Sequence, residues 1–124
     1  MSRIPVPGHR PLRRNRVSCK VKLQHKNALP VVQVIGELTG NDSARVSKKI
    51  LAQRAGKSKM VVVDLSETTF LDSHGLGVLV YAWRRLEERD QELVFMNPPP
   101  FVQNIFQGTN LANVLRVVES LDAL

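Results

Sequence analysis

The sequence has little of what marks a secreted, membrane-spanning or disulfide-stabilised protein. It contains one cysteine, Cys19, so no disulfide can form within the chain. No apolar run approaches the roughly 18–20 residues that a membrane-spanning helix needs. The N-terminus also has no continuous apolar segment of the kind found in signal peptides. We therefore expect a cytoplasmic protein in which Cys19 is a small core residue in a strand.

The usual signatures of a hydrolase are missing as well. Asp72-Ser73-His74 contains the three residue types of a catalytic triad, but neighbours in sequence point in different directions. A nucleophile elbow needs a glycine two residues before the serine, and Leu71 stands there. We expect no enzymatic activity.

Metal and nucleotide motifs are equally absent. The three histidines lack the spacing of metal ligands: His9, His25 and His74. No phosphate-binding P-loop motif occurs, and Gly75-x-Gly77 alone is too weak a pattern to replace one. The sequence predicts neither a cofactor nor a metal ion.

Acidic residues are absent from residues 1–16, which hold five arginines and three prolines. A segment of this composition cannot form a core, so we predict a disordered basic tail over 1–16 and one folded domain over 17–124. The tail carries most of the net charge of +7, because the rest of the chain has 13 basic and 11 acidic residues. Arginines can contact nucleic acid or anionic lipid, but no interleaved aromatic residues support nucleic-acid binding.

The apolar pattern of the folded part predicts alternating strands and helices. Strands are expected over 17–23, 31–38, 60–65, 93–96 and 114–118. Helices are expected over 44–55, 76–86 and 101–106, with a further short helix beginning at 119. The first two strands predict an antiparallel hairpin at one edge, with its turn over 25–30. We expect an α/β fold in which about four helices cover a mixed four- to five-stranded sheet.

The most informative stretch follows the strand over 60–65. An apolar pair, Phe70-Leu71, is expected to anchor a turn that presents Asp72-Ser73 at the start of a helix. A serine that caps a helix contributes about 1 kcal/mol, so Ser73 has a purely structural interpretation. Alternatively, Asp72 is the cap and Ser73 is left free. Gly75 and Gly77 each cost a helix roughly 1 kcal/mol relative to alanine, and we interpret them as exposing backbone to a partner.

Three segments of this stretch resemble the signature of STAS domains, the bacterial anti-sigma factor antagonists and their relatives. They are Asp64-Leu65-Ser66, Phe70-Leu71-Asp72-Ser73 and Gly75-Leu76-Gly77-Val78-Leu79. Further along, Pro100-x-Val102-x-x-x-Phe106 followed by Leu111 is similar to the third-helix pattern of the family. The resemblance covers roughly residues 17–124 and implies a STAS-like fold.

The resemblance implies a phosphorylation switch that controls transcription. In the family, a partner that is both serine kinase and anti-sigma factor phosphorylates the serine after the motif aspartate, and that serine is Ser73 here. The unphosphorylated antagonist binds the kinase and frees the sigma factor, and a PP2C-type phosphatase resets the switch. The implied partner-binding residues are Asp72, Ser73, His74, Gly75, Leu76 and Gly77.

One position departs from the family pattern. The residue after the acceptor is commonly serine or threonine in the family, and here it is His74. His74 could alter the choice of kinase, pair with a phosphate when protonated, or be an ordinary exposed residue. Other functions also stay open: a scaffold in a signalling assembly, an accessory subunit of a membrane transporter, or nucleic-acid binding through residues 1–16.

Overall fold

The computed structural model describes residues 19–53 and 56–124. Within these residues it has six strands: β1 (Cys19–Lys26), β2 (Leu29–Leu38), β3 (Met60–Asp64), β4 (Thr68–Leu71), β5 (Glu92–Met96) and β6 (Arg116–Val118). Its three α-helices are α1 (Ala44–Leu51), α2 (Ser73–Glu88) and α3 (Pro100–Gly108). Short 3-10 turns complete the connections: η2 (Gly40–Ser43), η3 (Gly56–Ser58), η4 (Leu111–Asn113) and η5 (Leu121–Ala123).

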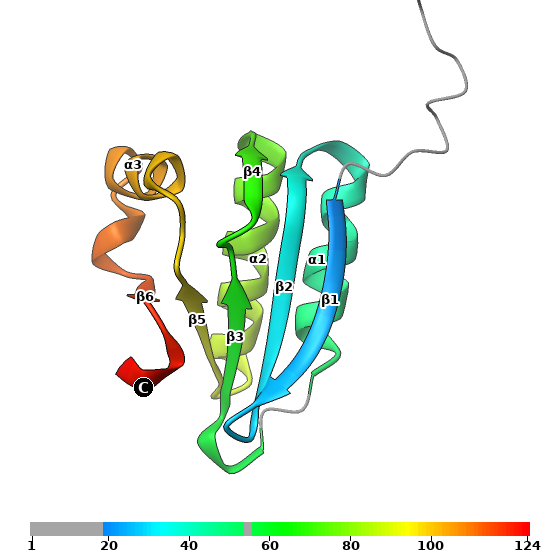
Figure 1. Ribbon diagram of the computed structural model, residues 1–124, viewed down its shortest axis with the longest axis vertical. Helices are drawn as coiled ribbons and strands as arrows, with labels where there is room; N and C mark the ends of the chain where they lie inside the picture. The colour runs from blue at the N-terminus through cyan, green and yellow to red at the C-terminus, as the bar shows by residue number, and fades with distance from the viewer. Residues whose placement is uncertain (1–18, 54–55) are drawn as a thin grey trace, which may run out of the picture.

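All strands belong to one mixed sheet with the order β1-β2-β3-β5-β6. β1 runs antiparallel to β2, and the other pairs are parallel. The long strand β2 pairs with β3 along its first half and with the short strand β4 at its far end, where Leu38 lies opposite Leu71. β4 therefore continues β3 along the same side of β2 (Figure 1).

The helices α1 and α2 cover one face of the sheet (Figure 1). Alternate residues of β2, β3 and β5 point into the core on that face, where Phe95 meets Phe106 of α3 edge to face at 5.6 Å. A smaller apolar cluster on the other face is covered in part by Leu121 and Leu124 of the C-terminal segment. Because both faces of the central strands are buried, their sequences are continuously apolar rather than alternating.

This architecture confirms the α/β fold and the N-terminal hairpin. The sheet has six strands among the described residues rather than four or five, because β4 was not expected. The fourth expected helix is only the 3-10 turn Leu121–Ala123. The hairpin turn is also shorter than predicted: Asn27 and Ala28 alone form it, with φ angles of 53° and 63°, the conformation of a two-residue hairpin turn.

Cys19 is the core residue that the sequence predicted. Its side chain is 2% exposed, and burial raises the pKa of its thiol because the charged form would lose its hydration. The Arg45 guanidinium donates to the Cys19 carbonyl oxygen and lies 3.8 Å from its sulfur. The predicted basic tail, by contrast, lies outside the described residues.

Candidate functional site

Hydrogen bonds shape the segment between β3 and α2 and hold it to the sheet. The Asp64 carboxylate accepts a hydrogen bond from the Ser66 backbone N–H at 2.9 Å, which shapes the turn after β3. The buried Thr68 hydroxyl then donates to the Val34 carbonyl of β2 at 3.0 Å. These bonds and the pairing of β4 with β2 bring Asp72 to the end of the sheet at which β4 ends and α2 begins (Figure 1).

Asp72 is the N-cap of α2. Its backbone is extended, and its carboxylate accepts a hydrogen bond from the Gly75 backbone N–H at 2.8 Å. Its carbonyl accepts the first bond of the helix, from the Leu76 N–H at 2.9 Å. Of the two interpretations left open by the sequence, the one in which Asp72 is the cap is therefore correct.

Ser73 is the first residue of the helix, and it is exposed. Among the residues that the structure describes, its hydroxyl makes no hydrogen bond. The free N–H groups and the dipole of a helix start favour negative charge at this place. The Ser73 hydroxyl is therefore available to solvent, and no side chain among the described residues engages it. His74 follows on the surface and is also exposed.

Gly75 is buried, and the reason differs from the one expected. A Cβ at this position would lie far inside van der Waals contact with the Leu38 carbonyl oxygen and 2.8 Å from Leu71 Cδ1. Glycine is needed here because the first turn of α2 packs directly against the ends of β2 and β4. Its role is close packing within the domain rather than exposure of backbone.

The surroundings of Gly77 differ from those of Gly75. It is exposed, and a Cβ built on it would meet no atom within 4 Å. Leu76, between the two glycines, is half-buried and packs against the core. The residue types of Gly75 and Gly77 therefore have separate explanations, one inside the domain and one on its surface.

Comparison with known proteins agrees with this geometry. A family model described as the STAS domain matches residues 20–124. This chain belongs to the STAS domain family. An anti-sigma-B factor antagonist of Listeria monocytogenes is 25% identical over 101 residues, which are 82% of this chain and 88% of the relative.

Solved structures have the same fold. An anti-sigma factor antagonist from Mycobacterium paratuberculosis superimposes with a TM-score of 0.73 at 24% identity, over 86% of this chain and 90% of the other. The Bacillus cell fate determinant SpoIIAA in its phosphorylated form gives a TM-score of 0.63 at 22% identity, over 84% of this chain and 96% of the other.

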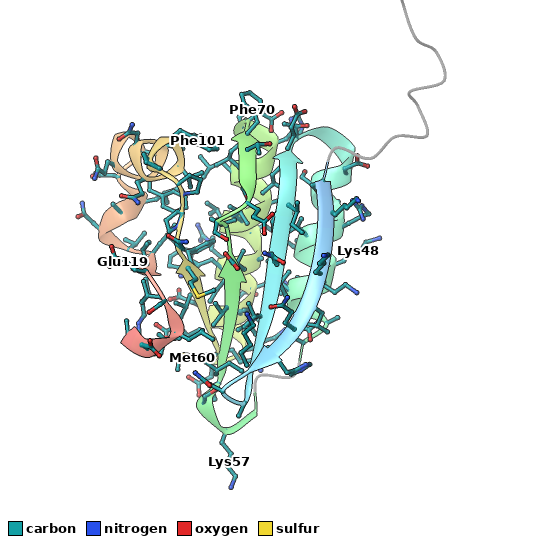
Figure 2. The ribbon with its side chains drawn as sticks, viewed as in Figure 1. Lys48, Lys57, Met60, Phe70, Phe101 and Glu119 are labelled. Atoms are coloured by element: carbon teal, nitrogen blue, oxygen red, sulfur yellow. The ribbon has the colours of Figure 1, made fainter. Side chains whose placement is uncertain are left out.

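Two aromatic side chains of this STAS domain, one on β4 and one in the middle of α2, are exposed. Phe70 is 52% exposed and lies at the end of the molecule where β4 ends (Figure 2). The expectation that it anchors the turn is wrong, because only Leu71 of that pair is buried. Tyr81, also 52% exposed, lies on α2 one turn beyond Gly77. The sequence offered a signal for Tyr81 alone, since the steps of four from Ser73 to Gly77 to Tyr81 follow one helix face.

Three further observations concern the neighbours of Ser73, metal ligands and helix length. The Asp72 carboxylate is engaged by Gly75, and the structure gives no hydrogen bond between Ser73 and His74 in this part of the chain. Across residues 19–53 and 56–124, no three His, Cys, Asp or Glu residues are grouped so that they could hold a metal ion. Over the same residues, the STAS domain has no helix of the length and apolarity needed to span a membrane.

Proposed function

We propose that this STAS domain is an anti-sigma factor antagonist that binds an anti-sigma factor with serine kinase activity. Phosphorylation of Ser73 by that kinase ends the interaction, and a PP2C-type phosphatase restores it. One observation carries the proposal: the Asp72 carboxylate caps α2, so the exposed Ser73 hydroxyl is not needed for the fold. The names of the Listeria and Mycobacterium proteins support it. We expect the protein to act in the cytoplasm, where a kinase finds ATP.

The partner-binding surface consists of the exposed residues at the start of α2. Ser73, His74 and Gly77 are exposed, and the half-buried Asp72 lies beside them. Gly75 and Leu76 support this surface from below, because they hold the helix start against the core. We extend the surface to Phe70 and Tyr81, since exposed aromatic residues often contribute most of the binding energy of an interface.

The physical basis of the switch is a local change of charge. A phosphate adds about −1.5 to −2 charges, and a helix start tolerates that charge, so the domain stays folded. Inside a partner interface, however, the same charge meets the Asp72 carboxylate and loses its hydration. A loss of about 3–4 kcal/mol in binding free energy corresponds to a several-hundred-fold weaker complex. The similarity of this chain to SpoIIAA in its phosphorylated form supports the expectation that such a domain folds with the phosphate in place.

A capture experiment with matched variants tests the proposal. Wild type, Ser73→Ala and Ser73→Asp are immobilised and exposed to lysate depleted of ATP, and mass spectrometry identifies the bound proteins. ATP is added only afterwards, and the residues that become phosphorylated are then mapped. We expect wild type and Ser73→Ala to retain a small ATP-binding kinase, and Ser73→Asp to lose it. Ser66→Asp is the control, because Ser66 is an exposed serine in the turn before β4.

The same experiment separates the proposal from its alternatives. Phosphate on Ser66, Thr68 or Thr69 instead of Ser73 would contradict the assigned acceptor. Recovery of a large assembly or of transporter subunits by all variants alike would indicate a scaffold or an accessory subunit. Nucleic acid that is retained only when residues 1–16 are present, and lost at moderate salt, would indicate binding through the arginines of that segment.

A further inference from the structure

The charges of this chain are divided unevenly between two parts of the domain. Residues 19–58 contain eight basic and two acidic residues, whereas residues 59–124 contain five basic and nine acidic residues. Six of these eight basic residues lie on β1 and α1, at the edge of the sheet away from β6. This edge is separate from the α2 surface that carries Ser73 (Figure 1).

β1 is a long edge strand with an unpaired backbone on one side. It stands at the end of the strand order and pairs only with β2. A two-residue turn makes Lys26 and Leu29 the hydrogen-bonded pair that closes the hairpin. Since bonded and non-bonded positions alternate along an antiparallel pair, the backbone N–H and C=O groups of Val21, Leu23 and His25 face away from β2. The engagement of the Cys19 carbonyl by the Arg45 side chain agrees with this alternation.

The free edge of β1 has apolar side chains on one face of the strand and basic side chains near both faces. A hollow of about 400 Å³ lies between β1 and α1, and it is lined by Val21, Arg45, Lys48, Lys49 and Ala52. Leu23, next along the same face of β1, is 40% exposed. Lys20 and Lys22 are exposed on the opposite face of the strand. Lys48 points outward beside β1 (Figure 2).

Within residues 19–53 and 56–124, none of the ion pairs involves Lys20, Lys22, Lys48 or Lys49. The ion pairs of the domain in that part join Lys59 to Asp90, Arg85 to Glu88 and Arg116 to Glu92, all away from β1. Edge lysines ordinarily prevent a sheet from pairing with other strands, because burying unpaired charge is costly. That barrier is selective, since a strand with carboxylates would neutralise the lysines instead of burying them.

We propose that the free edge of β1 binds an extended acidic peptide segment as an added strand. The backbone of Val21, Leu23 and His25 supplies the ladder hydrogen bonds. Acidic side chains on one face of the segment meet Lys20 and Lys22. The other face enters the hollow, where small apolar side chains contact Val21 and Leu23, and acidic ones reach the cations of α1: Arg45, Lys48 and Lys49.

The test measures fluorescence anisotropy of a labelled, acetylated eight-residue peptide in which Glu and Val alternate, titrated with the full chain. A second peptide has the same sequence with every backbone nitrogen methylated, so that it keeps its charge but can donate a ladder hydrogen bond from neither edge. Single-stranded DNA with the same number of negative charges is the third probe. We expect the unmethylated peptide to bind, and the methylated peptide and the DNA each to bind at least about tenfold more weakly.

Variants of the protein locate the site. Leu23→Pro removes an N–H that faces away from β2, and it should weaken peptide binding about tenfold, whereas Leu23→Ala keeps the N–H and should weaken it only about twofold to threefold. Lys20→Glu combined with Lys22→Glu should abolish binding. Lys57→Glu makes the same kind of charge change away from this edge and should have little effect (Figure 2).

The measurements can either support or overturn the proposed peptide site. Thermal unfolding of each variant shows whether Leu23→Pro remains folded, and the methylated peptide gives the same information on the ladder without altering the protein. Equal affinity for the methylated peptide or for the DNA would overturn the proposal, because polyanion binding alone would then explain the result. Ser73→Asp should bind the peptide like wild type, so the edge site and the proposed phosphorylation switch stand or fall separately.

Discussion

The first turns of α2 have a buried side that packs against the sheet and an exposed side that faces solvent. On the buried side, Gly75 and Leu79 fix the helix against β2 and the core. On the exposed side, Ser73, Gly77 and Tyr81 contribute little to packing. Under the proposed function, the residues that stabilise the fold and those that bind the partner lie on opposite faces of the same helix start. Substitutions on one face should therefore change folding, and substitutions on the other should change binding.

The largest expected effect is that of Gly75→Ala. The added methyl group would overlap the Leu38 carbonyl oxygen, and that oxygen belongs to backbone that cannot move alone. We expect the free energy of unfolding, measured by urea denaturation, to fall by about 3 kcal/mol, although alanine is the better helix former. A loss below about 0.5 kcal/mol would show that α2 can shift away from β2, and the division between the faces would fail.

Asp72→Ala should have the next largest effect on folding. Removal of the carboxylate leaves the Gly75 N–H without its 2.8 Å partner, and such N-cap losses cost about 1 kcal/mol. Asp72→Asn is the matched control, because the amide oxygen still caps the helix while the charge is gone. Under the proposed switch, Asp72→Asn should fold normally in urea denaturation but bind its partner more strongly after phosphorylation than the phosphorylated wild type does. Equal loss of stability in both variants would contradict a capping role.

Gly77→Ala should act in the opposite direction on folding. The position has open space around it, so alanine gains the helix preference of about 0.5–1 kcal/mol without a clash. The same methyl group lies on the proposed partner surface and should weaken binding to the kinase. A thermal melt and a binding titration on one preparation separate the two effects. A variant that is both more stable and fully competent to bind would remove Gly77 from the interface.

Ser73→Ala should have the smallest effect on folding. Since the hydroxyl has no hydrogen-bond partner among the described residues, we expect a change within about 0.5 kcal/mol in urea denaturation. The same variant should resist phosphorylation completely, which a radiolabel transfer assay with the captured kinase would measure. A substantial loss of stability would mean that Ser73 supports the helix start, contrary to the comparison.

The sequence predicted those parts of the fold whose apolar pattern is long and regular. The buried strand β3 and the helix α2 were found because one is continuously apolar and the other repeats at steps of three and four. β4 was missed because it has only four residues and exposes its two central side chains, Thr69 and Phe70. Pairing with β2 stabilises this strand, and that pairing cannot be inferred from the local sequence pattern.

The helix-capping pattern of the candidate site could be recognised in the sequence, whereas the packing beneath the helix start could not. Asp72 and Ser73 form a capping pattern that can be recognised locally, and the structure decides which of them is the cap. Gly75 and Gly77 look alike in the sequence. Only the Leu38 carbonyl, brought there by another strand, makes the first indispensable for packing and leaves the second open.

The bond from Thr68 to Val34 bears on the stage of folding at which the proposed acceptor, Ser73, becomes recognisable. Its two residues are 34 positions apart in the chain, and the bond lies under the segment that delivers Ser73. Contacts of such separation form late, because a long loop must close before they are made. A kinase that reads the shape around Ser73 would therefore pass over nascent or damaged chains. In that case phosphorylation would report the number of correctly folded molecules rather than the number synthesised.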